Sequence, residues 1–231
     1  MSLSGRANAR REVDLDAEMI LSITLTLYAQ KILGVFAIVN PFSTIPIFVS
    51  LTVGYSVAER NKTARAASVA VFVILVVAFI LGRYILEFFS ISIASFRVAG
   101  GLLILMTAFS MLNARLGATK QTDEESKEAQ NKENIAIIPL ALPLMAGPGA
   151  ISLMIISSNN TKTLVDHGSV ILGVAAIALS VWIILNAGAK ISKLLGTTGV
   201  NVATRLMGLI LAAIAVEFIV SGLGEKFPGL L

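Results

Sequence analysis

The sequence contains no cysteine and only one histidine, His167, among its 231 residues. The absence of cysteine excludes disulfide bonds, thiolate nucleophiles and cysteine-ligated metals. His167, which we expect in a loop, has no second histidine beside it to complete a metal or catalytic centre. The nucleotide-binding and hydrolase motifs GxxxxGK[ST], GxGxxG, GxSxG and HExxH are missing as well. We therefore expect no enzymatic activity, no metal and no cofactor.

Charged residues are also scarce. They make up 14% of the chain, whereas a soluble domain has about 25%. Hydrophobic residues reach 56% and the mean hydropathy is +0.86, which indicates an integral membrane protein. The net charge is +4, but the basic residues lie between apolar segments. We attribute the excess to the positive-inside rule and expect membrane lipid, not nucleic acid, as a partner.

The apolar segments predict an all-α, polytopic membrane protein with six transmembrane helices. The expected spans cover residues 19–53 (with an interruption), 68–89, 93–112, 135–157, 169–187 and 202–223. Residues 1–18 form a polar N-terminal tail, and residues 54–67 a polar connection between the first two spans. Residues 113–134 form the longest polar linker. We expect spans 1–3 (residues 19–112) and spans 4–6 (residues 135–231) to be separate halves.

Two spans contain residues that an unbroken helix disfavours. Asn40-Pro41 interrupts the first span, and Gly147-Pro148-Gly149 interrupts the fourth. Proline removes a backbone donor and clashes with the preceding turn, so helices 1 and 4 are predicted to be discontinuous. Exposed backbone groups at membrane depth are tolerated where they face protein or a wet cavity.

The two interruptions occupy matching positions in the two halves. Pro148 follows Pro41 by 107 positions, and Arg205-x-x-Gly208 follows Arg97-x-x-Gly100 by 108. The order of break, plain span and Arg-x-x-Gly span is the same in both halves. Because each half has three spans, the second starts on the opposite side of the membrane. The sequence therefore predicts two inverted three-helix repeats, the architecture in which a transporter site forms between discontinuous helices.

Orientation follows from the lysines and arginines. They are more numerous in the 1–2, 3–4 and 5–6 connections than in the termini and the 2–3 and 4–5 connections. The positive-inside rule then places both termini outside and the 3–4 linker in the cytoplasm.

The candidate substrate site lies at the two interruptions. Half-helices that start there direct free N–H groups and a partial positive charge at a ligand, which suits a carboxylate. The glycines allow close approach to the backbone. The candidate binding residues at the two breaks are Asn40, Pro41, Phe42, Ser43, Thr44, Gly147, Pro148, Gly149 and Ala150. The alternative interpretation is a pair of kinked helices whose prolines only shape packing.

Glu217 is a further candidate, because it interrupts the apolar sixth span. An ionisable group inside a membrane suggests an ammonium partner, a proton carrier or a cation ligand. The alternative is a structural ion pair, for which Lys31 is a candidate partner, or a position nearer the interface. Arg97 and Arg205 start repeat-related spans, where we expect them mainly to anchor the helices.

Several motifs together resemble the MarC family of integral membrane proteins. They are Asn40-Pro41-Phe42, Ala58-Glu59-Arg60-Asn61, Arg97-Val98-Ala99-Gly100-Gly101, Ala146-Gly147-Pro148-Gly149-Ala150 and Arg205-Leu206-Met207-Gly208. The resemblance covers roughly residues 19–224. It implies six spans in the inner membrane with outside termini and a cytoplasmic 3–4 loop. Some relatives are described as transporters of small neutral amino acids such as alanine and glycine.

The leading interpretation is a secondary transporter of small neutral amino acids that works by alternating access, with Na⁺ or H⁺ as coupling ion. The alternatives are an exporter of other small metabolites or drugs and a structural membrane protein without flux. The oligomeric state is left open by the sequence.

Overall fold

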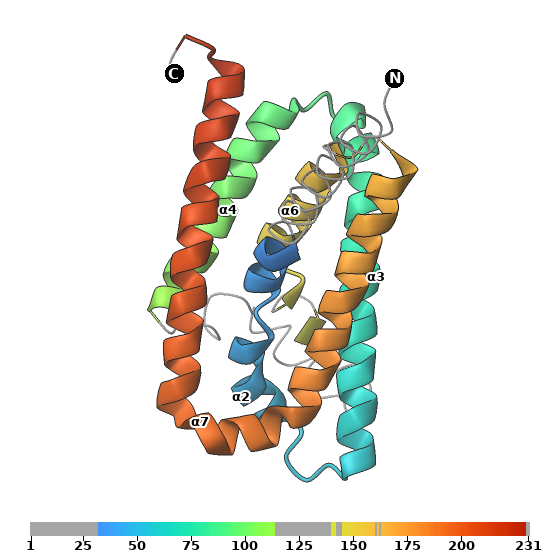
Figure 1. The fold of residues 1–231 in the computed structure, drawn as a ribbon, viewed down its shortest axis with the longest axis vertical. Helices are drawn as coiled ribbons and strands as arrows, with labels where there is room; N and C mark the ends of the chain where they lie inside the picture. Colours follow the sequence, from blue (N-terminus) through green and yellow to red (C-terminus); the bar gives the residue numbers. More distant parts are fainter. Residues whose placement is uncertain (1–31, 114–139, 142–144, 160, 162, 230–231) are drawn as a thin grey trace, which may run out of the picture.

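The computed structural model describes residues 32–113, 140–141, 145–159, 161 and 163–229, and these contain helices and no strand. Figure 1 shows the helices side by side in a bundle. The helices are α2 (Pro41–Leu51), α3 (Val57–Phe88), α4 (Ile93–Leu112), α6 (Pro148–Asn159) and α7 (Leu164–Lys226). Within the described part, five helical segments are long and apolar enough to cross a membrane: Ile32–Leu51, Val57–Phe88, Ile93–Leu112, Leu164–Gly196 and Thr198–Lys226.

The third predicted span, residues 93–112, coincides with α4. The second predicted span, residues 68–89, falls within α3 as far as Phe88. Residues 57–67, predicted as a connection, belong to the same helix. Ser56 and Glu59 form a capping box there, in which each side chain bonds the other residue's backbone N–H. The charged residues at this end of α3 therefore lie on a helix that continues beyond the apolar stretch.

The predicted fifth and sixth spans form the two halves of α7, joined at Gly196. Gly196 has φ 61°, a left-handed conformation that glycine adopts without steric cost. Thr163 and Asp166 form a second capping box at the start of α7. His167 therefore lies in the first turn of a helix, and its predicted placement in a loop is wrong.

The second half of α7 packs closely against α4 (Figure 1) through small residues on both helices. A methyl group on Gly101 would lie 2.8 Å from Ile219 Cγ1 and 2.9 Å from the Ala215 carbonyl oxygen. On α7, a methyl group on Gly222 would lie 2.8 Å from the Ala94 carbonyl oxygen. Small residues allow membrane helices to approach this closely.

Replacing Gly101 by leucine is expected to destabilise the protein by about 1–3 kcal/mol, since the added side chain meets the α7 backbone. Thermal unfolding of the purified variant in detergent measures the effect. Gly168→Leu is the matched control, because no atom of a described residue lies within 4 Å of a methyl group at that position. Equal melting temperatures for the two variants would show that the α4–α7 contact is looser than described.

The N-terminal tail and the 113–134 linker lie outside the described residues. Of the predicted fourth span, the structure describes residues 140–141 and 145–157. Lys31, the candidate partner of Glu217, is also outside the described part.

Candidate functional site

The helical conformation is interrupted at Asn40. Residues 32–39 are helical, Asn40 has φ 39° and ψ 70°, and α2 begins at Pro41. The Asn40 N–H closes the preceding helix by donating to the Phe36 carbonyl at 2.8 Å. Pro41 has no N–H to continue the ladder, and it suits the first position of the new helix. The Asn40 side-chain oxygen caps α2 by accepting from the Ser43 N–H at 3.4 Å.

A second helix starts at Pro148. The Ala146 N–H donates to the Ala141 carbonyl at 2.8 Å, a bond that spans five residues and is typical of a π-turn. Ala146 and Gly147 are not helical, and α6 begins at the next residue. The Ile151 N–H donates to the Gly147 carbonyl at 3.1 Å, so Gly147 takes the capping position.

These two helix starts lie close together in the middle of the bundle. A methyl group on Gly149 would lie 3.7 Å from Ile38 Cγ2, two residues before Asn40. It would also lie 3.4 Å from Ile104 Cγ1, near the middle of α4. Gly147, Gly149 and Ala150 are buried, as are Asn40 and Thr44. The start of α6 therefore packs against the helical segment that ends at Asn40, close to the start of α2.

Asn40 carries a buried donor that no described residue pairs. The residue is 2% exposed, and its Nδ2 atom forms no hydrogen bond within the described part of the chain. A buried amide hydrogen left unpaired costs about 1–3 kcal/mol. Such a group in a native structure is expected where a ligand, ion or water completes the bond.

A separate cavity of about 570 Å³ holds the charged candidates. Arg97 from α4 and Glu217 and Ser221 from α7 line it, together with Ser157 from α6 and Gly34. Arg97 is ion-paired to Glu225 at 3.1 Å, with the Arg97 side chain 18% exposed. Glu217, Ser221 and Glu225 follow one another at intervals of four, so they share one face of α7. The cavity therefore offers both a cation and a carboxylate within the bundle.

Residues 25–227 of this chain match the sequence model of a protein family whose description is "MarC family integral membrane protein". The chain belongs to the MarC family. It is accordingly an integral, multi-pass membrane protein, in agreement with the five apolar helical segments among its described residues.

Other MarC proteins match over nearly their whole length. The UPF0056 membrane protein YhcE of Escherichia coli is 43% identical over 204 residues, which cover 88% of this chain and 95% of that one. The UPF0056 membrane protein YvbG of Bacillus subtilis is 39% identical over 197 residues, with coverages of 85% and 93%. No solved structure matches this MarC chain.

The site residues predicted for this MarC protein fall into two groups. The structure gathers Asn40–Thr44 and Gly147–Ala150 around the two helix starts, although Pro148 itself is exposed. Glu217 lies apart from them, on the wall of the 570 Å³ cavity. The lining residues of this cavity that come nearest to the helix starts in sequence are Gly34 and Leu153. Gly34 is six residues before Asn40 and Leu153 is five after Pro148, which is about 9 and 8 Å along the helices. Glu217 is also exposed, with its Oε1 3.5 Å from the Ser221 hydroxyl.

The sequence did not predict the ion pair of Arg97 in this MarC protein. Sequence reasoning treated Arg97 and Arg205 alike, as anchors. The structure pairs Arg97 with Glu225 and places it on the cavity wall, whereas Arg205 is exposed and forms no ion pair with another described residue. The distance along the chain between Arg97 and Glu225 leaves no local signal for this pair.

Proposed function

We propose that this MarC protein is a secondary transporter of small neutral amino acids, such as alanine and glycine, in the cell inner membrane. The observation that carries the proposal is the meeting of two helix starts, at Pro41 and Pro148, beside the unpaired amide of Asn40. The substrate carboxylate would accept hydrogen bonds from these N–H groups and from Asn40 Nδ2. Helix N-termini favour anions without needing a buried cation.

The two halves would be inverted three-span repeats, with six spans in all and helices 1 and 4 discontinuous. The element boundaries support this proposal. α2 and α6 start 107 positions apart, as do α3 and α7, and the capping boxes at Ser56 and Thr163 share that interval. The packing is reciprocal, since Gly82 of α3 contacts Ile155 of α6 while Gly188 of α7 contacts Ile45 of α2. In a pair of repeats related by a two-fold axis, a helix of the first half packs on the second half in the same way as its counterpart packs on the first.

The inner faces of the site are small and apolar. Ile38, Ile104 and Ala150 are buried and closely packed around the helix starts, so they would accept at most a short side chain and offer no polar partner to a long one. Pro41 has no N–H to donate to the Ala37 carbonyl, and that carbonyl is a candidate acceptor for the substrate ammonium. The proposed preference is therefore for small, neutral amino acids.

The cavity lined by Arg97 and Glu217 would be the access route to the helix starts. Its two opposite charges, Arg97 and Glu217, would suit a zwitterion on its way to the neutral inner site. Both termini would face outside and the 3–4 linker the cytoplasm, which places this cavity, beside the end of α7, on the outer side. Na⁺ or H⁺ would be the coupling ion.

Glu217→Gln is expected to reduce amino acid uptake roughly fivefold to tenfold, because the entering ammonium loses a partly exposed carboxylate partner. Uptake at low and saturating substrate separates an effect on KM from one on turnover, and we expect the effect in KM. Glu87→Gln is the control, since Glu87 pairs with Arg83 on the exposed end of α3 at 2.7 Å. Unchanged KM in Glu217→Gln would remove Glu217 from the route.

Purified protein in liposomes tests the proposal. Labelled alanine and glycine are offered with no gradient, with a Na⁺ gradient and with a pH gradient. We expect accumulation against the amino acid gradient under one of the two ion gradients. The absence of flux for both amino acids under every gradient would contradict the proposal and favour a structural membrane protein.

A further inference from the structure

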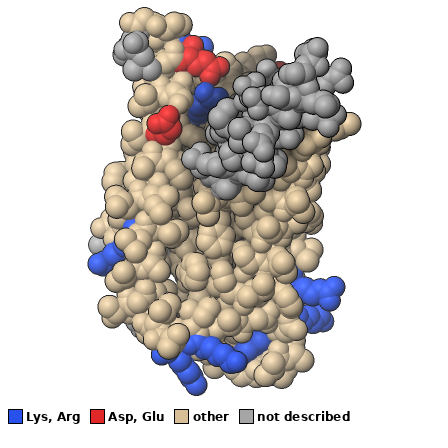
Figure 2. Space-filling model, viewed as in Figure 1, with Lys and Arg blue, Asp and Glu red and all other residues tan. Residues whose placement is uncertain are grey.

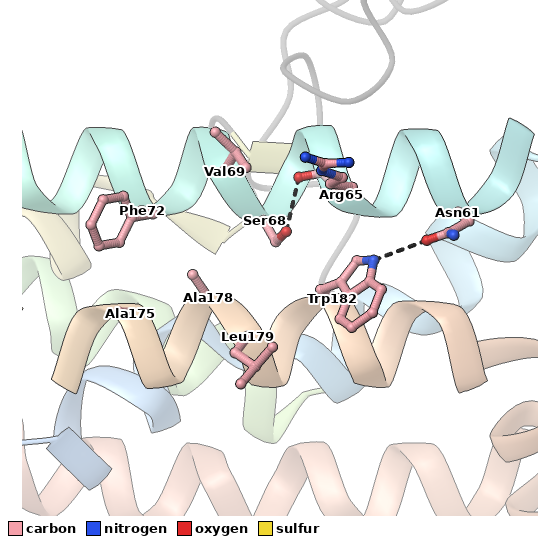
Figure 3. Close-up of a pocket in the computed structure, with 9 residues that line it drawn as sticks. All are labelled: Asn61, Arg65, Ser68, Val69, Phe72, Ala175, Ala178, Leu179 and Trp182. Atoms are coloured by element: carbon pink, nitrogen blue, oxygen red, sulfur yellow. Dashed lines mark hydrogen bonds between the residues drawn. The ribbon is translucent and has the colours of Figure 1, made fainter. Parts of the chain in front are cut away.

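A second groove lies on the outside of the bundle, between α3 and the first half of α7 (Figure 3). It has a volume of about 590 Å³. Its residues are Asn61, Arg65, Ser68, Val69 and Phe72 from α3, and Ala175, Ala178, Leu179 and Trp182 from α7. Val69 is 53% exposed and Leu179 is 55% exposed, so the groove opens to the surroundings of the helices.

The groove is polar at one end and apolar at the other. At the polar end, the Trp182 Nε1–H donates to Asn61 Oδ1 at 2.9 Å, next to Arg65 (Figure 3). Phe72 and Ala175 mark the apolar end, because the two helices run in opposite directions. Tryptophan with its N–H bonded to a polar partner is typical of the membrane–water interface.

The spacing of charges along α3 places the polar end at that interface. Arg65 and Arg83 are 18 residues apart, which is about 27 Å of helix. The hydrocarbon core of a bilayer is about 30 Å thick. Arg60, Lys62 and Arg65 precede the apolar stretch, so Val69 and Phe72 reach into the hydrocarbon while Arg65 remains at head-group level.

The charge at this end is positive, since α3 carries Arg60, Lys62 and Arg65 there against Glu59. No described acidic side chain forms an ion pair with Arg65. On the face shown in Figure 2, the lower end of the molecule carries basic side chains, whereas acidic ones lie toward the upper end. Lys190 and Lys193 of α7 are exposed near the turn at Gly196 and add to the positive charge.

We propose that this groove binds one anionic phospholipid. The phosphate contacts Arg65, while Asn61 and Trp182 border the head group. One acyl chain lies along Val69, Phe72 and Leu179. A neutral lipid would leave the Arg65 charge without a partner, and a free phosphate would leave the apolar half of the groove uncovered.

Trp182 is the only tryptophan of the chain, so its fluorescence reports on this groove alone. The full-length protein is reconstituted in phosphatidylcholine with increasing fractions of phosphatidylglycerol that carries brominated acyl chains, which quench tryptophan on contact. Brominated phosphatidylcholine in the same host measures non-selective contact. We expect phosphatidylglycerol to bind about fivefold more strongly than phosphatidylcholine, as one cation at the membrane surface provides.

Arg65→Gln is expected to bring this ratio close to one while leaving quenching by phosphatidylcholine unchanged, which also shows that the variant is folded. Lys62→Gln is the matched control, as an exposed basic residue of α3 that does not line the groove. It should stay within twofold of the original protein.

Three results would overturn the proposal. The first is a ratio near one in the original protein. The second is an equal loss of selectivity in Arg65→Gln and Lys62→Gln, which would indicate diffuse surface charge. The third is loss of the preference on adding inorganic phosphate at constant ionic strength, which would indicate a site for free anions.

Discussion

Asn40→Gly is expected to lower alanine uptake roughly 10- to 100-fold, because the substrate carboxylate loses a charge-assisted hydrogen bond from a buried donor. Glycine adopts the left-handed conformation of Asn40 without strain, so the backbone between the two helical segments is retained. Replacing an Asn cap by Gly costs only about a few tenths of a kcal/mol. The variant should therefore fold normally and transport alanine slowly.

Initial rates in liposomes measure this effect, with the melting temperature as a check on folding. Asn113→Gly is the matched control, since Asn113 caps the exposed end of α4 and donates to the Phe109 carbonyl at 2.9 Å. Uptake by Asn40→Gly at the level of Asn113→Gly would exclude a role for the Asn40 amide in binding.

Pro148→Ala is expected to lower uptake about tenfold through a different cause. Alanine supplies the N–H that proline lacks and removes the ring clash with the preceding turn. The helix can then extend upstream of Pro148. The carbonyls of the added turn would accept hydrogen bonds from the first N–H groups of α6, which would no longer be free to bind the substrate carboxylate. The melting temperature should stay close to that of the original protein, because proline is tolerated at the first position of a helix and its replacement there breaks no hydrogen bond.

Pro46→Ala provides the comparison for Pro148→Ala. Pro46 also lies in a short half-helix, but inside α2 and exposed, away from the helix start. We expect its uptake to stay within twofold of the original. A Pro148→Ala protein that transports normally would show that the start of α6 does not bind substrate.

The sequence predicts much of the fold because the bilayer restricts helix length. α4 coincides with the third predicted span, since Ser92 and Asn113 border its apolar stretch. The start of α3 is mispredicted for a related reason. Charged residues end a membrane span but not a helix, and the capping box at Ser56 and Glu59 is the better signal for the helix terminus. The same signal at Thr163 and Asp166 would have placed His167 in α7.

The site was only partly predictable. Asn40 and Gly147 are not helical, because each precedes a proline that cannot continue the helix. This effect is local and can be read from the sequence. The contact between Gly149 and Ile38, and the pairing of Arg97 with Glu225, depend on how distant segments pack. The groove at Trp182 likewise depends on which faces of α3 and α7 pack against each other. Apolar periodicity carries little information about such contacts, because membrane helices are apolar on nearly all faces.

In the proposed transporter, the starts of α2 and α6 lie close together, and their relative motion carries substrate across the membrane. Because the chain has no cysteine, the variant with both Ile38→Cys and Gly149→Cys contains a single cysteine pair. The structure places these positions in contact, and Gly149 has room for a Cβ atom. The decisive measurement is alanine uptake by liposomes holding this variant, before oxidation, after oxidation and after reduction. We predict that oxidation forms the disulfide and abolishes uptake, and that reduction restores it. Failure to form the disulfide, or full uptake with the disulfide formed, would contradict the account.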